Sequence, residues 1–187
     1  MSNSAGTFVY KIENDADRSV KHKSGRPSEK ITAYRVNTTT GGLTPIPDSS
    51  FATHGPASIT VNPTGTFLYL VNTVYVANTA NMVIMGDIPH ELENGNITAF
   101  RINSATGALT PVRGGPFAEG KRPLSITINP TGTFAFVATQ EDKWQGQQCS
   151  IQAYHIDSTT GALVHSTSNS SSAVPIFCFE TIRIIQP

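Results

Sequence analysis

Four residues that can carry acid–base or metal chemistry lie close together near the middle of the chain. The segment TVYVANTANMVIMGDIPHELENGN (residues 73–96) contains Asp87, His90, Glu91 and Glu93 within seven positions. Carboxylates and an imidazole at this spacing suit a general acid–base or a divalent cation. The spacing matches no calcium loop or zinc motif, so we expect no metal, and the alternative is a solvated loop with a turn at GDIP. We take His90 and Glu91 as candidate catalytic residues.

A histidine and a basic pair precede two similarly placed prolines. His54 comes before the sequence Gly-Pro, and Lys121 with Arg122 comes before Pro123. An imidazole there is suited to move a proton during hydrolysis. A lysine and an arginine can hold a carboxylate or a phosphate. His54 is therefore a third catalytic candidate, and Lys121 and Arg122 are candidate substrate-binding residues. The alternatives are a loop histidine and an exposed basic pair without a role.

Composition and motifs exclude several classes of protein. Thirteen basic and thirteen acidic residues give zero net charge, so nothing in the composition suggests that the chain binds nucleic acid or anionic lipid. There is no serine elbow, no phosphate-binding glycine loop and no dinucleotide fingerprint, and we expect no cofactor. Cys149 and Cys178 form no ligand spacing. We interpret them as ordinary thiols, with a disulfide or a metal site as alternatives.

Nothing in the sequence indicates export or membrane insertion. The first residues, MSNSAGTFVYKIENDADRS, have no basic head followed by an apolar stretch. No apolar run approaches the roughly 18 residues that a membrane span needs. We therefore expect a soluble protein of the cytoplasm.

Two sequence blocks recur along the chain in a fixed order. The first block reads ITAYRVNTTTGGLTP (31–45), ITAFRINSATGALTP (97–111) and IQAYHIDSTTGAL (151–163). The second block reads PASITVNPTGTFLYLVN (56–72) and PLSITINPTGTFAFVAT (123–139), and AGTFVY (5–10) matches its middle. Repetition of this kind is the signature of a repeat architecture.

Each repeat predicts four antiparallel strands. Alternating apolar residues at Ile59 and Val61 indicate a strand with one buried face, and Asn62-Pro63-Thr64-Gly65 is a turn. The run from Phe67 to Val71 is apolar enough to be covered on both sides. Strands over residues 97–102 and 109–112 flank a second turn with Gly107. No helical period is present, and a β-sandwich gives no reason for the same turn to recur.

Four-stranded units of this length predict an all-β fold made of β-propeller blades. We expect a single partial propeller domain over residues 1–187, with an incomplete ring. Its blades are expected at about residues 6–46 (without a first strand), 57–112 and 124–165, followed by an off-pattern tail at 166–187.

One face of such a propeller carries the links between blades and the loops between second and third strands. These segments are residues 14–29, 47–56, 73–96, 113–123 and 140–149. Function commonly resides on loops that a rigid scaffold positions. All five candidate site residues fall in these segments.

The repeats resemble those of the lactonase-type seven-bladed propellers, which include 6-phosphogluconolactonase-like proteins and share YVTN-type repeats. The resemblance rests on NPTGTFLYLVN (62–72), ITAFRINSATGALTPV (97–112) and the link GGPFAEGKRP (114–123). It implies hydrolysis of a sugar lactone. Members often carry Gly-Pro-Arg-His where the inner strand begins, but this chain has Gly-Pro-Ala-Ser at 55–58 and Arg-Pro-Leu-Ser at 122–125. A binding or scaffold propeller without catalysis is therefore the alternative.

The number of blades leaves further alternatives open. Closed propellers have about four to eight blades, and this chain has fewer than three complete ones. It is a fragment of a longer product, or it associates with itself through its open blade edges, or it is a decayed reading frame without independent function. Unpaired edges and bare sheet faces favour association.

Overall fold

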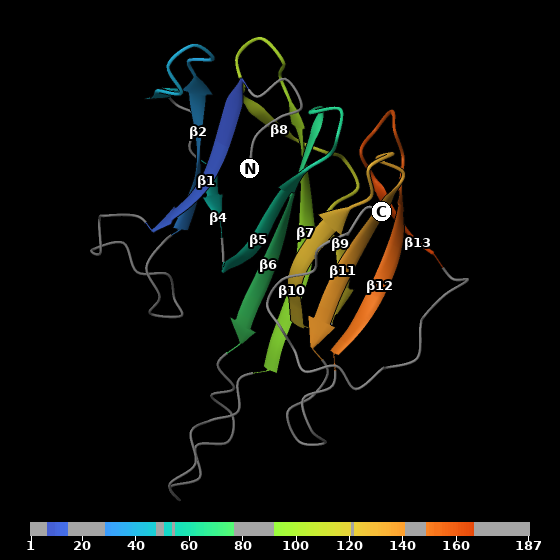
Figure 1. Cartoon of the computed structure of the whole chain (residues 1–187). Coiled ribbons are helices and arrows are strands. Elements are labelled where there is room, and N and C mark those ends of the chain that lie inside the picture. The colour runs from blue at the N-terminus through green and yellow to red at the C-terminus, as the bar shows by residue number, and fades with distance from the viewer. Residues whose placement is uncertain are drawn as a thin grey trace, which may run out of the picture.

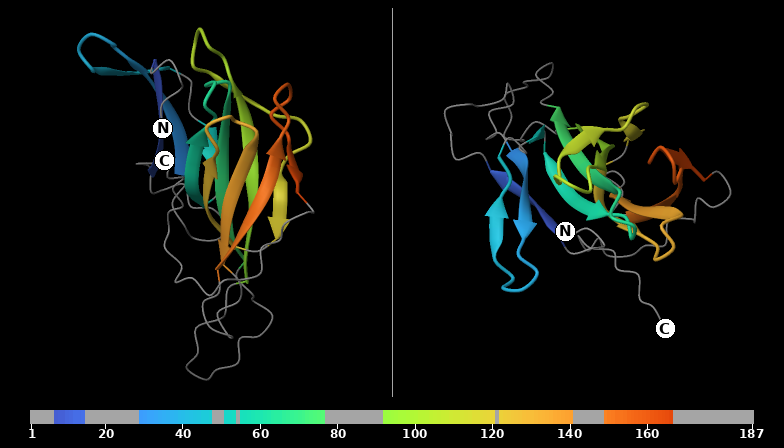
Figure 2. Two further views of the ribbon diagram at one scale, coloured as in Figure 1. Left: turned by 45° about the vertical axis from the view of Figure 1, so that its right-hand side comes forward. Right: turned by 90° about the horizontal axis from the view of Figure 1, so that it is seen from above.

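The computed structural model describes residues 7–14, 29–47, 51–53, 55–76, 92–120, 122–140 and 149–166 (Figure 1). The secondary structure in these ranges is β-strand, arranged as three antiparallel sheets. Seen from above, the sheets stand next to one another in chain order and do not close a ring (Figure 2). The prediction of antiparallel propeller blades in an incomplete ring is confirmed. Within these ranges, no helix has the length and apolarity to cross a membrane.

Each sheet is one blade, and its first three strands lie side by side in chain order. Blade one contains β1 (Phe8–Asn14), β2 (Glu29–Val36), β3 (Leu43–Pro45) and β4 (Phe51–Thr53). Blade two contains β5 (Pro56–Val61), β6 (Phe67–Val76), β7 (Leu92–Ile102), β8 (Leu109–Pro111) and β9 (Phe117–Gly120). Blade three contains β10 (Arg122–Ile128), β11 (Phe134–Gln140), β12 (Cys149–Ile156) and β13 (Leu163–His165).

The recurring asparagines fix the first hairpin turn of blades two and three. Asn62 Oδ1 accepts hydrogen bonds from the amides of Thr66 and Phe67, each at 2.9 Å. Its amide nitrogen donates to Thr64 Oγ1 at 2.8 Å. Asn129 makes the same set of bonds one blade later. A side chain that satisfies local backbone donors explains why NPTGT recurs.

The outer strand of blades one and two is built from two pieces, which differs from the sequence prediction. Residues 47–56 and 113–123 were expected to be loops, but β4 and β9 lie within them. β3 and β4 both pair with β2, and β8 and β9 both pair with β7. The short pieces have too few residues to show an alternating pattern in the sequence. They are strands because they pair with the long neighbouring strand.

Blade two is buried on both faces, as its apolar strand predicted. Phe67, Tyr69 and Val71 contribute to the core between blades two and three. Leu68 and Leu70 contribute to the core between blades one and two. Successive residues of a strand point to opposite faces, so β6 supplies both cores at once.

A repeated contact, which we call the joint, connects each blade to the next at the second hairpin turn. The Tyr10 hydroxyl donates to Gly107 O at 2.9 Å, and burial raises the pKa of Tyr10 to about 12. The Phe8 ring lies against Gly107, where a Cβ atom would be 2.6 Å from Phe8 Cδ1. The Arg35 guanidinium lies 5.0 Å from the centre of the Phe8 ring and donates to Ala105 O at 3.1 Å.

Blades two and three repeat the joint residue for residue. The Tyr69 hydroxyl donates to Gly161 O at 3.1 Å, and the Phe67 ring occupies the space where a Cβ of Gly161 would lie. Arg101 lies 4.7 Å from the centre of the Phe67 ring and donates to Thr159 O. Each joint therefore combines ring packing, a buried tyrosine hydrogen bond and an arginine hydrogen bond.

The joint predicts that a methyl group at Gly161 is costly. Gly161 and Gly41 occupy equivalent turns with φ of 80° and 72°, but no heavy atom of the described residues lies within 4 Å of a Cβ at Gly41. Gly161→Ala should therefore lower the free energy of unfolding by about 1–3 kcal/mol more than Gly41→Ala, because both share the backbone strain and only one overpacks. Urea denaturation in dilute solution measures the difference, and equal losses would contradict the contact.

Candidate functional site

The strands of all three blades end together on the side opposite the joints. β6 ends at Val76 and β7 begins at Leu92 on this side, which is lowermost in Figure 1 and which we call the loop face. The strands reach further into the 73–96 segment than expected, because residues 73–76 pair with residues 92–95. Glu93 consequently belongs to β7 rather than to a loop.

One of the five candidate site residues lies in the described part of the chain. His54, His90, Glu91 and Lys121 lie outside the described residues, and their roles stay predictions. Arg122 is the first residue of β10 and pairs with Gln140 at the end of β11, so it lies at the loop face. The strand ends thus place Arg122 where the propeller topology predicted it.

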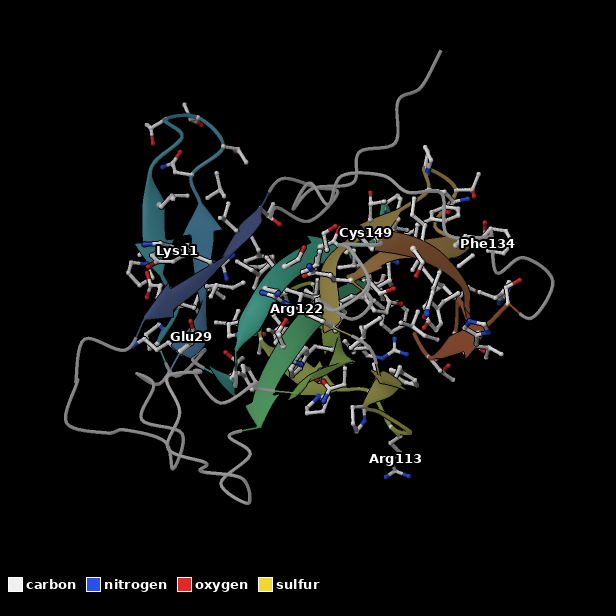
Figure 3. All side chains as sticks on the ribbon, turned by 90° about the horizontal axis from the view of Figure 1, so that it is seen from below. Lys11, Glu29, Arg113, Arg122, Phe134 and Cys149 are labelled. Carbon is white, nitrogen blue, oxygen red and sulfur yellow. The ribbon has the colours of Figure 1, made fainter. Side chains whose placement is uncertain are left out.

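Arg122 is half-buried, and the Gln140 side chain is one of its hydrogen-bond partners. Its Nη1 donates a hydrogen bond of 2.8 Å to Gln140 Oε1. Figure 3 looks onto the molecule from below and shows Arg122 between blades two and three. A guanidinium has five N–H donors in a planar fork and keeps its charge at all relevant pH values. Such a group is suited to hold a carboxylate or a phosphate on the loop face.

Amide and hydroxyl side chains fix the loop-face end of blade two. The Asn72 amide nitrogen donates to Asn96 Oδ1 at 2.9 Å and to Thr98 Oγ1 at 3.0 Å. The buried hydroxyl of Thr73 donates to Pro123 O at 3.1 Å, which connects blade two to blade three one residue from Arg122. Gly95 fits beneath the Pro123 ring, where any Cβ would collide with it. This end of blade two and the start of β10 are therefore packed directly against each other.

Blade three has a related arrangement, and a disulfide lies beside it. Thr139 Oγ1 and Ser150 Oγ are 2.8 Å apart and share a hydrogen bond. The neighbouring Cys149 is disulfide-bonded. The interpretation of this residue as an ordinary thiol is therefore wrong, and the disulfide alternative holds. The sequence contains one other cysteine, Cys178, which lies outside the described residues.

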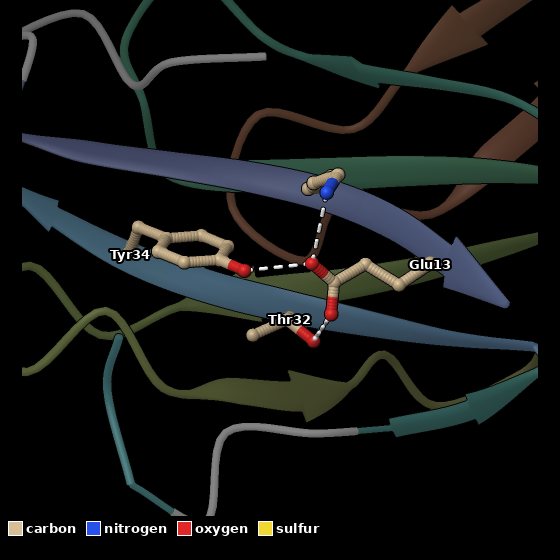
Figure 4. Close-up of polar contacts among 4 residues, drawn as sticks. Glu13, Thr32 and Tyr34 are labelled. Carbon is tan, nitrogen blue, oxygen red and sulfur yellow. Dashed lines mark hydrogen bonds and ion pairs between the residues drawn. The ribbon is translucent and has the colours of Figure 1, made fainter. Parts of the chain in front are cut away.

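The loop-face end of blade one carries a charged network that the sequence analysis missed (Figure 4). Glu13 accepts hydrogen bonds from the Tyr34 hydroxyl at 2.7 Å and from Thr32 Oγ1 at 2.9 Å, and Lys11 Nζ lies 3.1 Å from the carboxylate. These hydrogen bonds, with Tyr34 first, lower the pKa of Glu13 from 4.5 to about 2. The signal was available, since Lys-x-Glu stands where blade two has Leu70 and Asn72.

The described residues offer no ready metal site. No group of three His, Cys, Asp or Glu side chains gathers within these ranges in a way that could hold an ion. Both described histidines belong to blade three, and the β11–β12 register places His155 beside Phe134, at the opposite end of the blade from Arg122. Among the five candidate site residues, Arg122 is therefore the one whose position the structure describes, and neither described histidine lies near it.

The network predicts an unusually acidic Glu13. Because its folded-state pKa lies below the ordinary value, the network stabilises the fold above about pH 4.5, and this contribution is lost as the pH falls towards 2. Tyr34→Phe should raise the pKa of Glu13, since it removes the strongest hydrogen bond to the charged form. A titration followed by carboxyl-carbon NMR measures this pKa. Tyr154→Phe is the control, because Tyr154 donates to Gln152, and a Glu13 pKa near 4.5 in the unsubstituted protein would contradict the network.

Comparison with protein-family models identifies the fold independently of this geometry. Residues 46–180 match a model described as lactonase, seven-bladed β-propeller. The matched segment includes all of blades two and three together with Arg122. Comparison with curated proteins finds no match. Because the matched segment makes up well over half of the sequence, the chain belongs to the lactonase family of seven-bladed β-propellers.

Proposed function

We propose that this propeller, when its ring is complete, hydrolyses a sugar lactone that carries a carboxylate or a phosphate, as in 6-phosphogluconolactone. The observation that carries the proposal is the fixed position of Arg122 on the loop face of a lactonase-family propeller. An anionic group of the substrate would accept hydrogen bonds from the guanidinium, and these would orient the ring. Family membership by itself does not establish a reaction. Arg122 adds a specific group, a guanidinium that can bind an anionic substrate.

The proposed reaction needs one proton acceptor and one anion-binding group. A water oxygen attacks the lactone carbonyl carbon and gives its proton to an imidazole or a carboxylate. The ring C–O bond then breaks, and the departing alkoxide takes that proton, which leaves a hydroxy acid. His54 is our first candidate for the proton transfer, with His90 and Glu91 as alternatives, and Lys121 would assist Arg122 in binding the acid group.

A binding propeller without catalysis is the second candidate function. It is favoured by the Ala-Ser and Leu-Ser sequences that follow Pro56 and Pro123, where members of the family often have Arg-His. In this case Arg122 would still bind a sugar acid, but no ring opening would follow. The two candidates therefore share a ligand and differ in the reaction.

A panel of phosphorylated and uncharged sugar lactones, assayed with a propeller whose ring is complete, tests the proposal. We expect ring opening above the buffer rate, and Arg122→Gln should lower kcat/KM for the phosphorylated lactone about 10- to 100-fold, mainly through KM, because a charge-assisted hydrogen bond is lost. The uncharged lactone should lose less. His54→Ala should lower kcat. Arg113→Gln is the matched control, since Arg113 is exposed and lies apart from Arg122 (Figure 3).

The outcomes separate the two candidates. A rate equal to that of buffer for every lactone would contradict the hydrolase. Calorimetric binding of 6-phosphogluconate that Arg122→Gln weakens and Arg113→Gln leaves unchanged would then support the binding propeller.

A further inference from the structure

Blade three presents one half of the joint with no blade against it in the described part of the chain. Phe134 is equivalent to Phe8 and Phe67, but its side chain is 37 % exposed while each of theirs is 1 % exposed. Ile151 is 37 % exposed, whereas the equivalent Ile31 and Ile97 are fully buried. Of the four large apolar side chains that are exposed among the described residues, three belong to this blade: Phe134, Ile151 and Val164.

These side chains form one continuous surface on the face of blade three that points away from blade two. The β11–β12 register places Phe134 beside His155, Phe136 beside Ala153 and Ala138 beside Ile151. The intervening residues Ala135 and Val137 belong to the core with blade two, so this set faces the other way. An exposed apolar patch with the composition of a buried joint indicates a binding surface for another blade.

Blade one presents the other half of the joint. Its turn over residues 37–41 has the same internal hydrogen bonds as the two covered turns, with Asn37 Oδ1 accepting from the amides of Thr39 and Thr40. Gly41 has a positive φ of 72°, as Gly107 and Gly161 also have positive φ, but no atom in the described part of the chain lies within 4 Å of its Cβ position. Leu43, which is 53 % exposed, corresponds to the buried Leu109 of blade two.

We propose that copies of this chain associate head to tail, with blade three of one copy covering the outer face of blade one of the next. The Phe134 ring would lie on Gly41 of the second copy, as Phe8 and Phe67 lie on Gly107 and Gly161. Thr39 O and Gly41 O would face His155 and Phe136, in the positions that Arg and Tyr of the built joints occupy. The interface is heterologous, because two different surfaces of the chain meet.

The association is expected to be weaker than the joints within one chain. Phe136 has no hydroxyl for the glycine carbonyl, and His155 replaces the arginine that lies over the ring in both built joints. His155 instead lies edge-on to Phe134, with 5.6 Å between the ring centres. On the partner side, the Lys11–Glu13 network replaces part of the apolar surface of blade two, so the contact would centre on the turn and on Val9, Val36 and Leu43.

Sedimentation velocity over a concentration series tests the proposal. We expect reversible association of the unsubstituted chain. Phe134→Glu and Gly41→Ala should each abolish it, because each disables one half of the joint. Phe136→Tyr combined with His155→Arg should lower the dissociation constant about tenfold or more, since it restores two hydrogen bonds. Arg113→Glu is the control for an added carboxylate and should associate normally.

Mixing the two disabled variants gives the sharpest result. The Gly41→Ala copy keeps an intact blade three, and the Phe134→Glu copy keeps an intact blade one, so the mixture should form a dimer and nothing larger. Far-UV circular dichroism confirms that each variant is folded. A mixture that stays monomeric, or an unsubstituted chain and a restored variant that are both monomeric at every concentration, would overturn the proposal. Because sedimentation needs no lactone, it is independent of the outcome of the lactonase assays.

Discussion

The packing of an aromatic ring on a glycine turn is the contact on which the arrangement of the blades depends. Phe8 and Phe67 occupy space that only a residue without Cβ leaves open, and the same glycines accept the tyrosine hydrogen bonds of Tyr10 and Tyr69. One residue type therefore satisfies the positive φ of the turn, the close approach of the ring and the buried hydroxyl. A flat sheet could slide over its neighbour, but a ring seated on a glycine fixes the position of each blade.

The joints lie at one end of the blades, and the candidate site lies at the other. Arg122 therefore owes its position relative to Asn72 and Thr73 to contacts at the far end of the blades, together with the Thr73–Pro123 hydrogen bond and the close fit of Gly95. A site placed at the ends of rigid strands keeps its geometry while its residue types vary. This division explains how Glu13, Asn72 and Thr139 stand at equivalent positions with different chemistry.

The strands and hairpin turns could be predicted from the sequence because their causes are local. Asn62 and Asn129 bond the backbone of their own turns, and Gly107 and Gly161 supply a positive φ. The two-piece outer strands could not be predicted, since the pairing of β4 and β9 depends on strands far away in the chain. The joint could not be predicted for a similar reason. Residues equivalent to Phe67 and Arg101 recur in the repeat, but the sequence does not show that their side chains contact the turn of the next blade. For the site, only the position of Arg122 followed from topology.

Several departures from the repeat lie on the two outward-facing surfaces. Blade two supplies the aromatic ring, tyrosine and arginine of the joint with blade three, and its glycine turn receives those of blade one. It is therefore covered on both faces. Blade one changes Leu70 and Asn72 of the pattern to Lys11 and Glu13 on its outer face, and blade three changes the joint tyrosine and arginine to Phe136 and His155. A blade surface that is always covered by the same neighbouring blade is expected to keep the apolar residue types of the repeat, because burying a charge without a partner costs free energy. Lys11, Thr32 and Tyr34 bind the Glu13 carboxylate, so the loop-face end of blade one can be exposed to solvent. The turn with Gly41, at the other end of the blade, keeps the conformation found in the two covered joints.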